Sequence, residues 1–174
     1  MVRISATFAA FRDALSAGYD VIHYAGHGLG SSKDIGNEAL VLTVNPKGGK
    51  WEPDVVFRAS DIANHAQLSE TPCADSRPIV VLNCCETGQT GYTLTSIGGM
   101  AAALLGAGAG VVISPLWSVD DIAAADFAKA FYVAMRAGNT LADAARAART
   151  AIRNAGDQTW LAYTIYGEPT AKLA

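Results

Sequence analysis

The stretch PIVVLNCCETG, residues 78–88, decides the fold. Its first six residues are almost all apolar and include β-branched side chains, which is typical of a strand buried on both faces in the middle of a parallel sheet. The glycine that closes the stretch marks a turn. We therefore expect a central strand over residues 78–83, with helices packed on both of its faces.

Apolar runs of the same kind occur on either side of this stretch. Residues 19–25 (YDVIHYA) precede the turn-forming sequence GHGLGSS, and residues 110–114 (GVVIS) follow a glycine-rich segment. Both runs predict strands. The other strands are expected at residues 39–44, 55–57 and 160–166, and the helices at 5–17, 59–67, 95–105, 121–135 and 141–154. This alternation predicts an α/β fold, a three-layer α/β/α sandwich around a mostly parallel central sheet.

Size and charge exclude several classes of protein. The chain has 174 residues, which fits a single domain over 1–174 and is long enough to bury a core. With 13 basic and 16 acidic side chains the net charge is −3, so there is no electrostatic basis for binding nucleic acid or an anionic membrane surface. Apolar residues make up 51% of the chain, which excludes a disordered protein.

A long uncharged segment runs from residue 89 to residue 119. A membrane span needs about 20 predominantly apolar residues. The centre of this segment is instead rich in glycine and alanine, and Pro115 follows it. We interpret the segment as a buried helix, a glycine turn and a buried strand, and we expect no membrane partner.

The cysteines do not form a disulfide framework. There are three of them, Cys73, Cys84 and Cys85, and two are adjacent. The first ten residues lack the apolar core and the cleavage site of a signal peptide. A reducing, cytoplasmic compartment is the expected location.

Two of the expected strands lead into residues that can carry chemistry. In open α/β sheets, ligands bind at the carboxyl ends of the strands, where His27 and Cys85 are expected. A cysteine nucleophile needs a base, and backbone N–H groups must face the developing oxyanion. Gly28 and Gly88 leave room for a substrate to approach closely. Taken singly, such a cysteine is more often a small buried apolar residue, so both interpretations stay open at this point.

Motifs for cofactors and metals are missing from the sequence. The glycine-rich run at 106–110 precedes a strand rather than following one, so it does not match the dinucleotide-binding pattern. The sequence GHGLGSSK lacks the Gly-Lys-Ser/Thr ending of a phosphate-binding loop. Apart from His23 and His27, which are four positions apart but straddle the end of a strand, the histidines and cysteines do not have the spacing of metal ligands. We expect no cofactor and no metal.

Four motifs together resemble the CHAT domain, a caspase-like cysteine protease domain that is related to separase and found with tetratricopeptide repeats. They are listed here in chain order: DVIHYAGHG at 20–28, VVLNCCETG at 80–88, GVVISPLWSVDD at 110–121 and WLAYTIYGEP at 160–169. The resemblance covers roughly residues 5–170 and implies a caspase-like sandwich. Cys85 lies 58 positions after His27, which fits the caspase-type spacing, in which the histidine lies about 50 residues upstream.

The resemblance assigns a role to each position that matches a family motif. His27 matches the catalytic histidine and Cys85 the nucleophile, and the N–H groups of Gly28 and Cys85 are implied as the oxyanion hole. Cys84 stands where the family usually has alanine, so we expect a small buried thiol. We interpret His23, inside the strand, as a packing residue.

A substrate pocket is implied beside the strand that follows the cysteine strand. Asp120 and Asp121 match the region in which separase-like members hold a basic side chain before the scissile bond, with Trp117 as a pocket wall. The alternative for the two aspartates is a helix N-cap, where a carboxylate also interacts with the helix dipole. Some family members cleave after apolar residues.

The resemblance thus implies a cysteine endopeptidase that acts on a protein or peptide substrate. Family members are usually controlled by a repeat-containing sensor or partner, often in bacterial defence or cell-death pathways. Here only about 18 residues precede the histidine strand, so we expect that an N-terminal strand and a regulatory region of the family are lacking. The alternative function is an inactive module of the same fold that binds a peptide.

Overall fold

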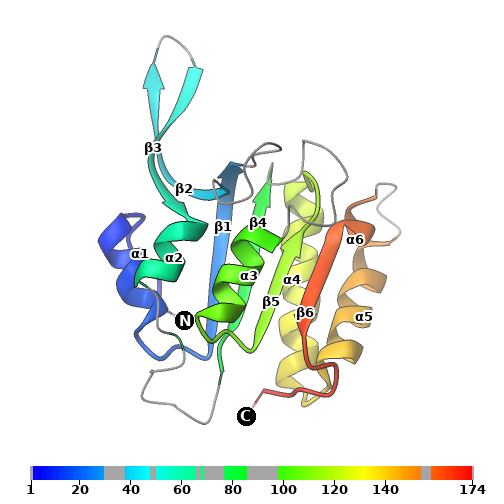
Figure 1. The fold of residues 1–174 in the computed structure, drawn as a ribbon. Coiled ribbons are helices and arrows are strands. Elements are labelled where there is room, and N and C mark those ends of the chain that lie inside the picture. Colours follow the sequence, from blue (N-terminus) through cyan, green and yellow to red (C-terminus); the bar gives the residue numbers. More distant parts are fainter. Residues whose placement is uncertain are drawn as a thin grey trace.

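Within its described part, the chain forms a six-stranded sheet with helices on both faces (Figure 1). The computed structural model describes residues 2–29, 38–47, 50–65, 68, 77–85, 98–153 and 158–173. The strands are β1 (Val21–Leu29), β2 (Ala39–Lys47), β3 (Lys50–Arg58), β4 (Ile79–Cys85), β5 (Val111–Pro115) and β6 (Tyr163–Gly167). The helices are α1 (Phe8–Leu15), α2 (Ala59–His65), α3 (Gly98–Gly106), α4 (Asp121–Arg136), α5 (Leu141–Ile152) and α6 (Thr159–Ala162).

The centre of the sheet is parallel and its edges are antiparallel. The strand order is β3-β2-β1-β4-β5-β6, and β4 pairs in parallel with both β1 and β5. The pairs β1–β2, β2–β3 and β5–β6 are antiparallel. The predicted fold class, an α/β/α sandwich with a mostly parallel centre, is confirmed.

The alternation of elements did not predict the antiparallel edges. Strands β2 and β3 are joined by only two residues, 48 and 49, and so short a connection requires antiparallel strands. Two successive long helices, α4 and α5, return the chain to the end of the sheet where β5 finishes. There the N–H of Leu116 donates to the carbonyl of Ala162 over 2.8 Å, so β6 must run back against β5.

Two apolar clusters lie on opposite faces of the sheet. In β1 and β4, even-numbered residues pack against α1, α2 and α3. In β4 and β5, odd-numbered residues pack against α4 and α5 on the other face. This period of two is the geometry of a β-strand. The buried strand residues of the first cluster include Ile22, Tyr24, Val80, Leu82, Cys84 and Val112. Those of the second include Ile79, Val81, Val111 and Ile113.

Side-chain caps explain where three of the helices begin. The hydroxyl of Thr7 accepts from the N–H of Ala10 at the start of α1. Asp120 caps α4, and Thr140 caps α5. Ser, Thr and Asp are preferred at this position because their oxygens satisfy N–H groups that have no partner within the helix. The starts of α4 and α5 match the predicted residues 121 and 141, while α1 begins three residues after the predicted start at residue 5.

Several element boundaries differ from those predicted. Strand β1 continues to Leu29, because its pairing with β2 carries it through the expected turn sequence. The short extended piece at 55–57 belongs to the nine-residue β3. The expected strand at 160–166 begins as the one-turn helix α6, and β6 starts at Tyr163. Residues 95–97 of the expected helix lie outside the described residues.

Across the described residues, no helix is both long and apolar enough to cross a membrane. Of the uncharged segment 89–119, the described part contains the nine-residue α3 and the buried strand β5. The buried strand agrees with the prediction, whereas α3 is buried on one side only, since Met100, Ala101 and Leu104 are buried and Ala102 is exposed.

Candidate active site

The two predicted catalytic positions are neighbours in the sheet. Strands β1 and β4 run side by side in parallel, and His27 of β1 is the register partner of Cys85, the last residue of β4. Both positions therefore lie at the carboxyl ends of paired parallel strands, where α/β sheets carry their ligands. His27 is exposed. The side chain of Cys85 and the whole of Gly88 lie outside the described part of the chain.

A cleft of about 520 Å³ opens beside His27, between the sheet and α4. The lining residues from the sheet are His23, Ala25, Gly26, His27 and Asn83. Those from α4 and the residues before it are Val119, Asp121, Ala124, Ala125 and Ala128. Three of the residues that α4 contributes are alanines, and their small side chains leave the space between helix and sheet open. The cleft is large enough for a substrate side chain.

His23 lines this cleft, although we predicted a packing residue. Its Nδ1 atom is 2.8 Å from the hydroxyl of Tyr132 on α4. Solvent reaches the ring through the cleft, but desolvation by the surrounding protein still lowers the pKa of His23. Burial raises the pKa of Tyr132 above its usual value. The hydroxyl and the ring nitrogen share one hydrogen bond, and the tautomer of His23 decides which of them donates.

Asn83 connects the strand of the cysteine to the far wall of the cleft. Its Nδ2 donates to the carbonyl of Ala124 in α4 at 3.2 Å, and its Oδ1 accepts from the hydroxyl of Tyr163 at 2.8 Å. The ring of Tyr163 stacks on Phe127 of α4, with centroids 3.7 Å apart and an interplanar angle of 5°. Sequence analysis did not identify this residue. The available signal was a polar side chain inside an apolar strand, two residues before Cys85.

The predicted pocket residues lie in different surroundings. The Oδ1 of Asp120 accepts from the N–H groups of Ile122 at 3.1 Å and Ala123 at 2.9 Å, which makes it the N-cap of α4. Asp121 lines the cleft. Trp117 is half-buried and packs against the cluster beneath α4 and α5. The structure thus brings Asp121 and His27 to one cleft. The contacts of Asp120 are those of a helix N-cap, which was the alternative interpretation of the two aspartates.

Cys84 is fully buried, with 0% of its surface exposed, in the cluster beneath α1, α2 and α3. The expectation of a small buried thiol at this position is confirmed. Because strand residues alternate between faces, adjacent positions 84 and 85 belong to opposite sides of the sheet. Position 84 therefore belongs to the face covered by α1, α2 and α3, and position 85 to the opposite face.

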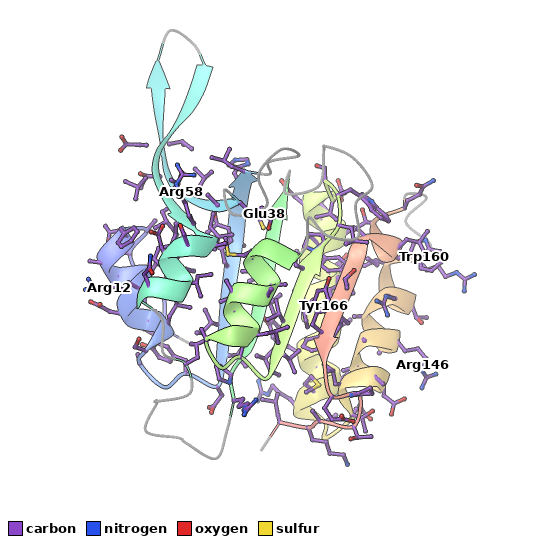
Figure 2. All side chains as sticks on the ribbon, in the orientation of Figure 1. Arg12, Glu38, Arg58, Arg146, Trp160 and Tyr166 are labelled. Carbon is purple, nitrogen blue, oxygen red and sulfur yellow. The ribbon has the colours of Figure 1, made fainter. Side chains whose placement is uncertain are left out.

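Glu38 is a buried carboxyl group that sequence analysis missed (Figure 2). It is only 3% exposed, and its Oε2 accepts from the N–H of Met100 in the first turn of α3 at 3.0 Å. Its carbonyl accepts from the N–H of Ala59, where α2 begins. Burial raises the pKa of Glu38, and the hydrogen bond from Met100 partly opposes that shift. One residue thus joins the start of β2 to two helices.

Comparison with known families identifies the chain. The family model of the CHAT domain matches residues 2–168. This chain belongs to the CHAT domain family. The match confirms the resemblance seen in the four motifs, and CHAT is a caspase-like, protease-related family. No curated protein matches the chain. Among the described residues of this CHAT domain, no group of three or more potential ligands could hold a metal ion.

Proposed function

We propose that this CHAT domain is a cysteine endopeptidase in which Cys85 is the nucleophile and His27 the general base and acid. The observation that supports this most directly is the register of β1 and β4, in which the two residues are partners. Neighbouring strands lie about 4.8 Å apart, which brings a thiol and an imidazole at such positions within reach of each other. Membership of a protease-related family adds independent support.

The proposed reaction proceeds in two halves. His27 takes the thiol proton, and the Cys85 thiolate attacks the scissile carbonyl to form a carbon–sulfur bond. The N–H groups of Gly28 and Cys85 hold the resulting oxyanion. The oxyanion collapses, His27 protonates the leaving amine, and an acyl-enzyme remains. Water then attacks this thioester, with His27 taking its proton, and the acid product and the free thiol are released.

The cleft beside His27 is the proposed site for the substrate residue that precedes the scissile bond. Asp121 is the acidic residue among those that line the cleft, so we propose a preference for a basic residue there. Trp117 is not among the residues that line the cleft, so its role as a pocket wall is proposed from the family resemblance alone. We leave Asp120 as the helix cap, because its carboxylate is already bonded to two N–H groups.

We propose further that the substrate is a protein and that a sensor or partner, such as a repeat-containing protein, controls the activity. A bacterial defence or cell-death pathway in the cytoplasm is the proposed setting. The regulator and the setting are both proposed from the family alone. The net charge of −3 adds no nucleic-acid or anionic-membrane partner.

A thiol-reactive peptide probe tests the proposed dyad. We expect labelling at Cys85 that is lost in Cys85→Ala and strongly reduced in His27→Ala. Cys84→Ala is the matched control and should be labelled like the parent protein, because Cys84 is buried. If the folded protein binds the peptide but is not labelled, the domain is a binding module and the proposed enzyme is wrong.

A further inference from the structure

The side chain of Tyr24 forms hydrogen bonds to the backbone at the end of β1. It is 9% exposed, and its hydroxyl is 2.8 Å from the carbonyl oxygen of His27 and 2.7 Å from that of Val41. Val41 is the register partner of His27 on β2, so the hydroxyl lies between the two strands. A single phenolic proton thus serves two carbonyl groups, one of which belongs to the proposed catalytic residue.

Gly26 is what allows this arrangement. A Cβ atom at position 26 would lie 2.7 Å from the Tyr24 hydroxyl oxygen and 3.0 Å from the ring carbon that carries it. The first distance is shorter than real Cβ contacts and the second is tighter than most of them, so a side chain at position 26 would displace the hydroxyl. Glycine lets the tyrosine fold back along its own strand to reach His27. The sequence Tyr-Ala-Gly-His-Gly therefore encodes a contact and not only a turn.

The contact fixes the direction of a peptide group. The carbonyl of His27 and the N–H of Gly28 belong to the same peptide unit, which is planar and trans, so they point in opposite directions. The carbonyl is bound on the side of β2, together with the carbonyl of Val41. The N–H of Gly28 must then point toward β4, on which Cys85 is the register partner of His27.

We propose that Tyr24 is a positioning residue, which aims the N–H of Gly28 at the oxyanion and polarises it through the His27 carbonyl. The inference rests on the proposed function, because it needs an oxyanion to form beside Cys85. Hydrogen bonds in series polarise one another, so a donor at the His27 carbonyl makes the N–H on the same peptide a stronger donor.

The chemistry of the buried phenol suits this role. Burial, and next the nearby Cys84, raise the pKa of Tyr24, while its two backbone hydrogen bonds oppose the shift. The hydroxyl therefore stays protonated at neutral pH and acts there as a hydrogen-bond donor.

The test compares Tyr24→Phe and Gly26→Ala with Tyr166→Phe as control. Tyr166 is a half-buried tyrosine packed against the same cluster, so its variant measures the general cost of losing a phenol. Peptide hydrolysis reports on the oxyanion. Alkylation of Cys85 by iodoacetamide reports on the thiolate alone, because sulfur displaces iodide and no oxyanion forms. The amide resonance of Gly28, followed by NMR in the free protein, reports on the peptide group without any reaction.

We expect kcat to fall about tenfold in both variants of the contact, less than the 10²–10³-fold loss when an oxyanion donor is deleted. In Tyr24→Phe, KM and the alkylation rate should be unchanged, whereas Gly26→Ala is read by kcat and by NMR because Gly26 lines the substrate cleft. The Gly28 resonance should move only in these two variants. An unmoved Gly28 resonance, an equal loss of kcat in Tyr166→Phe, or a loss confined to KM would overturn the proposal. A parent protein whose Cys85 shows no His27-dependent alkylation would instead refute the proposed function, and the role of Tyr24 with it.

Discussion

The buried carboxyl group of Glu38 gives a prediction that does not depend on any enzymatic activity. The variant Glu38→Gln keeps an oxygen that can accept from the Met100 N–H, but it removes the ionisable group. The variant Glu38→Ala removes the acceptor as well. Because the site is only 3% exposed, solvent cannot replace the lost partner. The two variants therefore separate the hydrogen bond from the charge.

The size of the hydrogen-bond effect follows from the cost of leaving a buried N–H without an acceptor. Glu38→Ala should lower the free energy of unfolding by about 1–3 kcal/mol. In a domain of this size, each kcal/mol corresponds to about 2–4 °C in Tm. Glu38→Gln should lose much less, because its amide oxygen replaces the carboxylate oxygen.

The charge effect appears in the pH dependence. The pKa of Glu38 is raised above its usual value of 4.5 by burial, so the folded protein holds this proton to a higher pH than the unfolded chain does. The stabilisation is fully present below the unfolded pKa and is lost as pH rises through the folded pKa. The parent protein should therefore lose stability relative to Glu38→Gln as pH rises.

Urea unfolding followed by circular dichroism at about pH 5 and about pH 8 measures this difference. The difference between the two proteins isolates Glu38, because every other titrating group is common to both. We expect the free energy of unfolding of Glu38→Gln, relative to that of the parent, to be higher at the higher of the two pH values. A difference that does not change with pH, or that favours the parent at high pH, would refute the reasoning.

Four further predictions concern α4 and the residues that contact it. Tyr163→Phe should cost about 0.5–1.5 kcal/mol by removing the donor to Asn83, and a double-mutant cycle with Asn83→Ala should show coupling; additive losses would disprove the bond. Asp120→Ala should cost about 0.5–2 kcal/mol as a lost helix cap, which thermal unfolding measures, and an unchanged Tm would contradict the capping role. Asp121→Asn should weaken any preference for a basic residue before the scissile bond, as read from peptide-library cleavage. Phe127→Ala should cost about 3–5 kcal/mol in urea unfolding, since the ring is fully buried and stacked, and a loss well below that range would contradict the packing.

Much of the fold could be predicted because its signals are local. The apolar runs identify the central strands, and the caps at Asp120 and Thr140 mark the starts of two helices. The direction of the edge strands is not local. It depends on the length of the β2–β3 connection and on the return of the chain through α4 and α5. The extension of β1 to Leu29 likewise depends on pairing with β2.

The same distinction applies to the candidate site. His27 and Cys85 could be singled out because each follows an apolar run and has glycines beside it. Tyr24, Asn83 and Glu38 could not, because their partners are distant in sequence. Tyr24 reaches the carbonyl of a residue 17 positions away, and Asn83 contacts groups 41 and 80 positions away. The pattern of residues within one strand does not indicate which distant residues will contact its side chains.

The most direct test of the central claim is hydrolysis of a peptide library by the parent domain, Cys85→Ala and Cys84→Ala, each confirmed as folded by circular dichroism. The two cysteines are adjacent, yet one is the register partner of His27 and the other is fully buried. We predict that Cys85→Ala abolishes cleavage and that Cys84→Ala retains most of it. Cleavage that survives in Cys85→Ala, or an equal loss in both folded variants, would contradict the account.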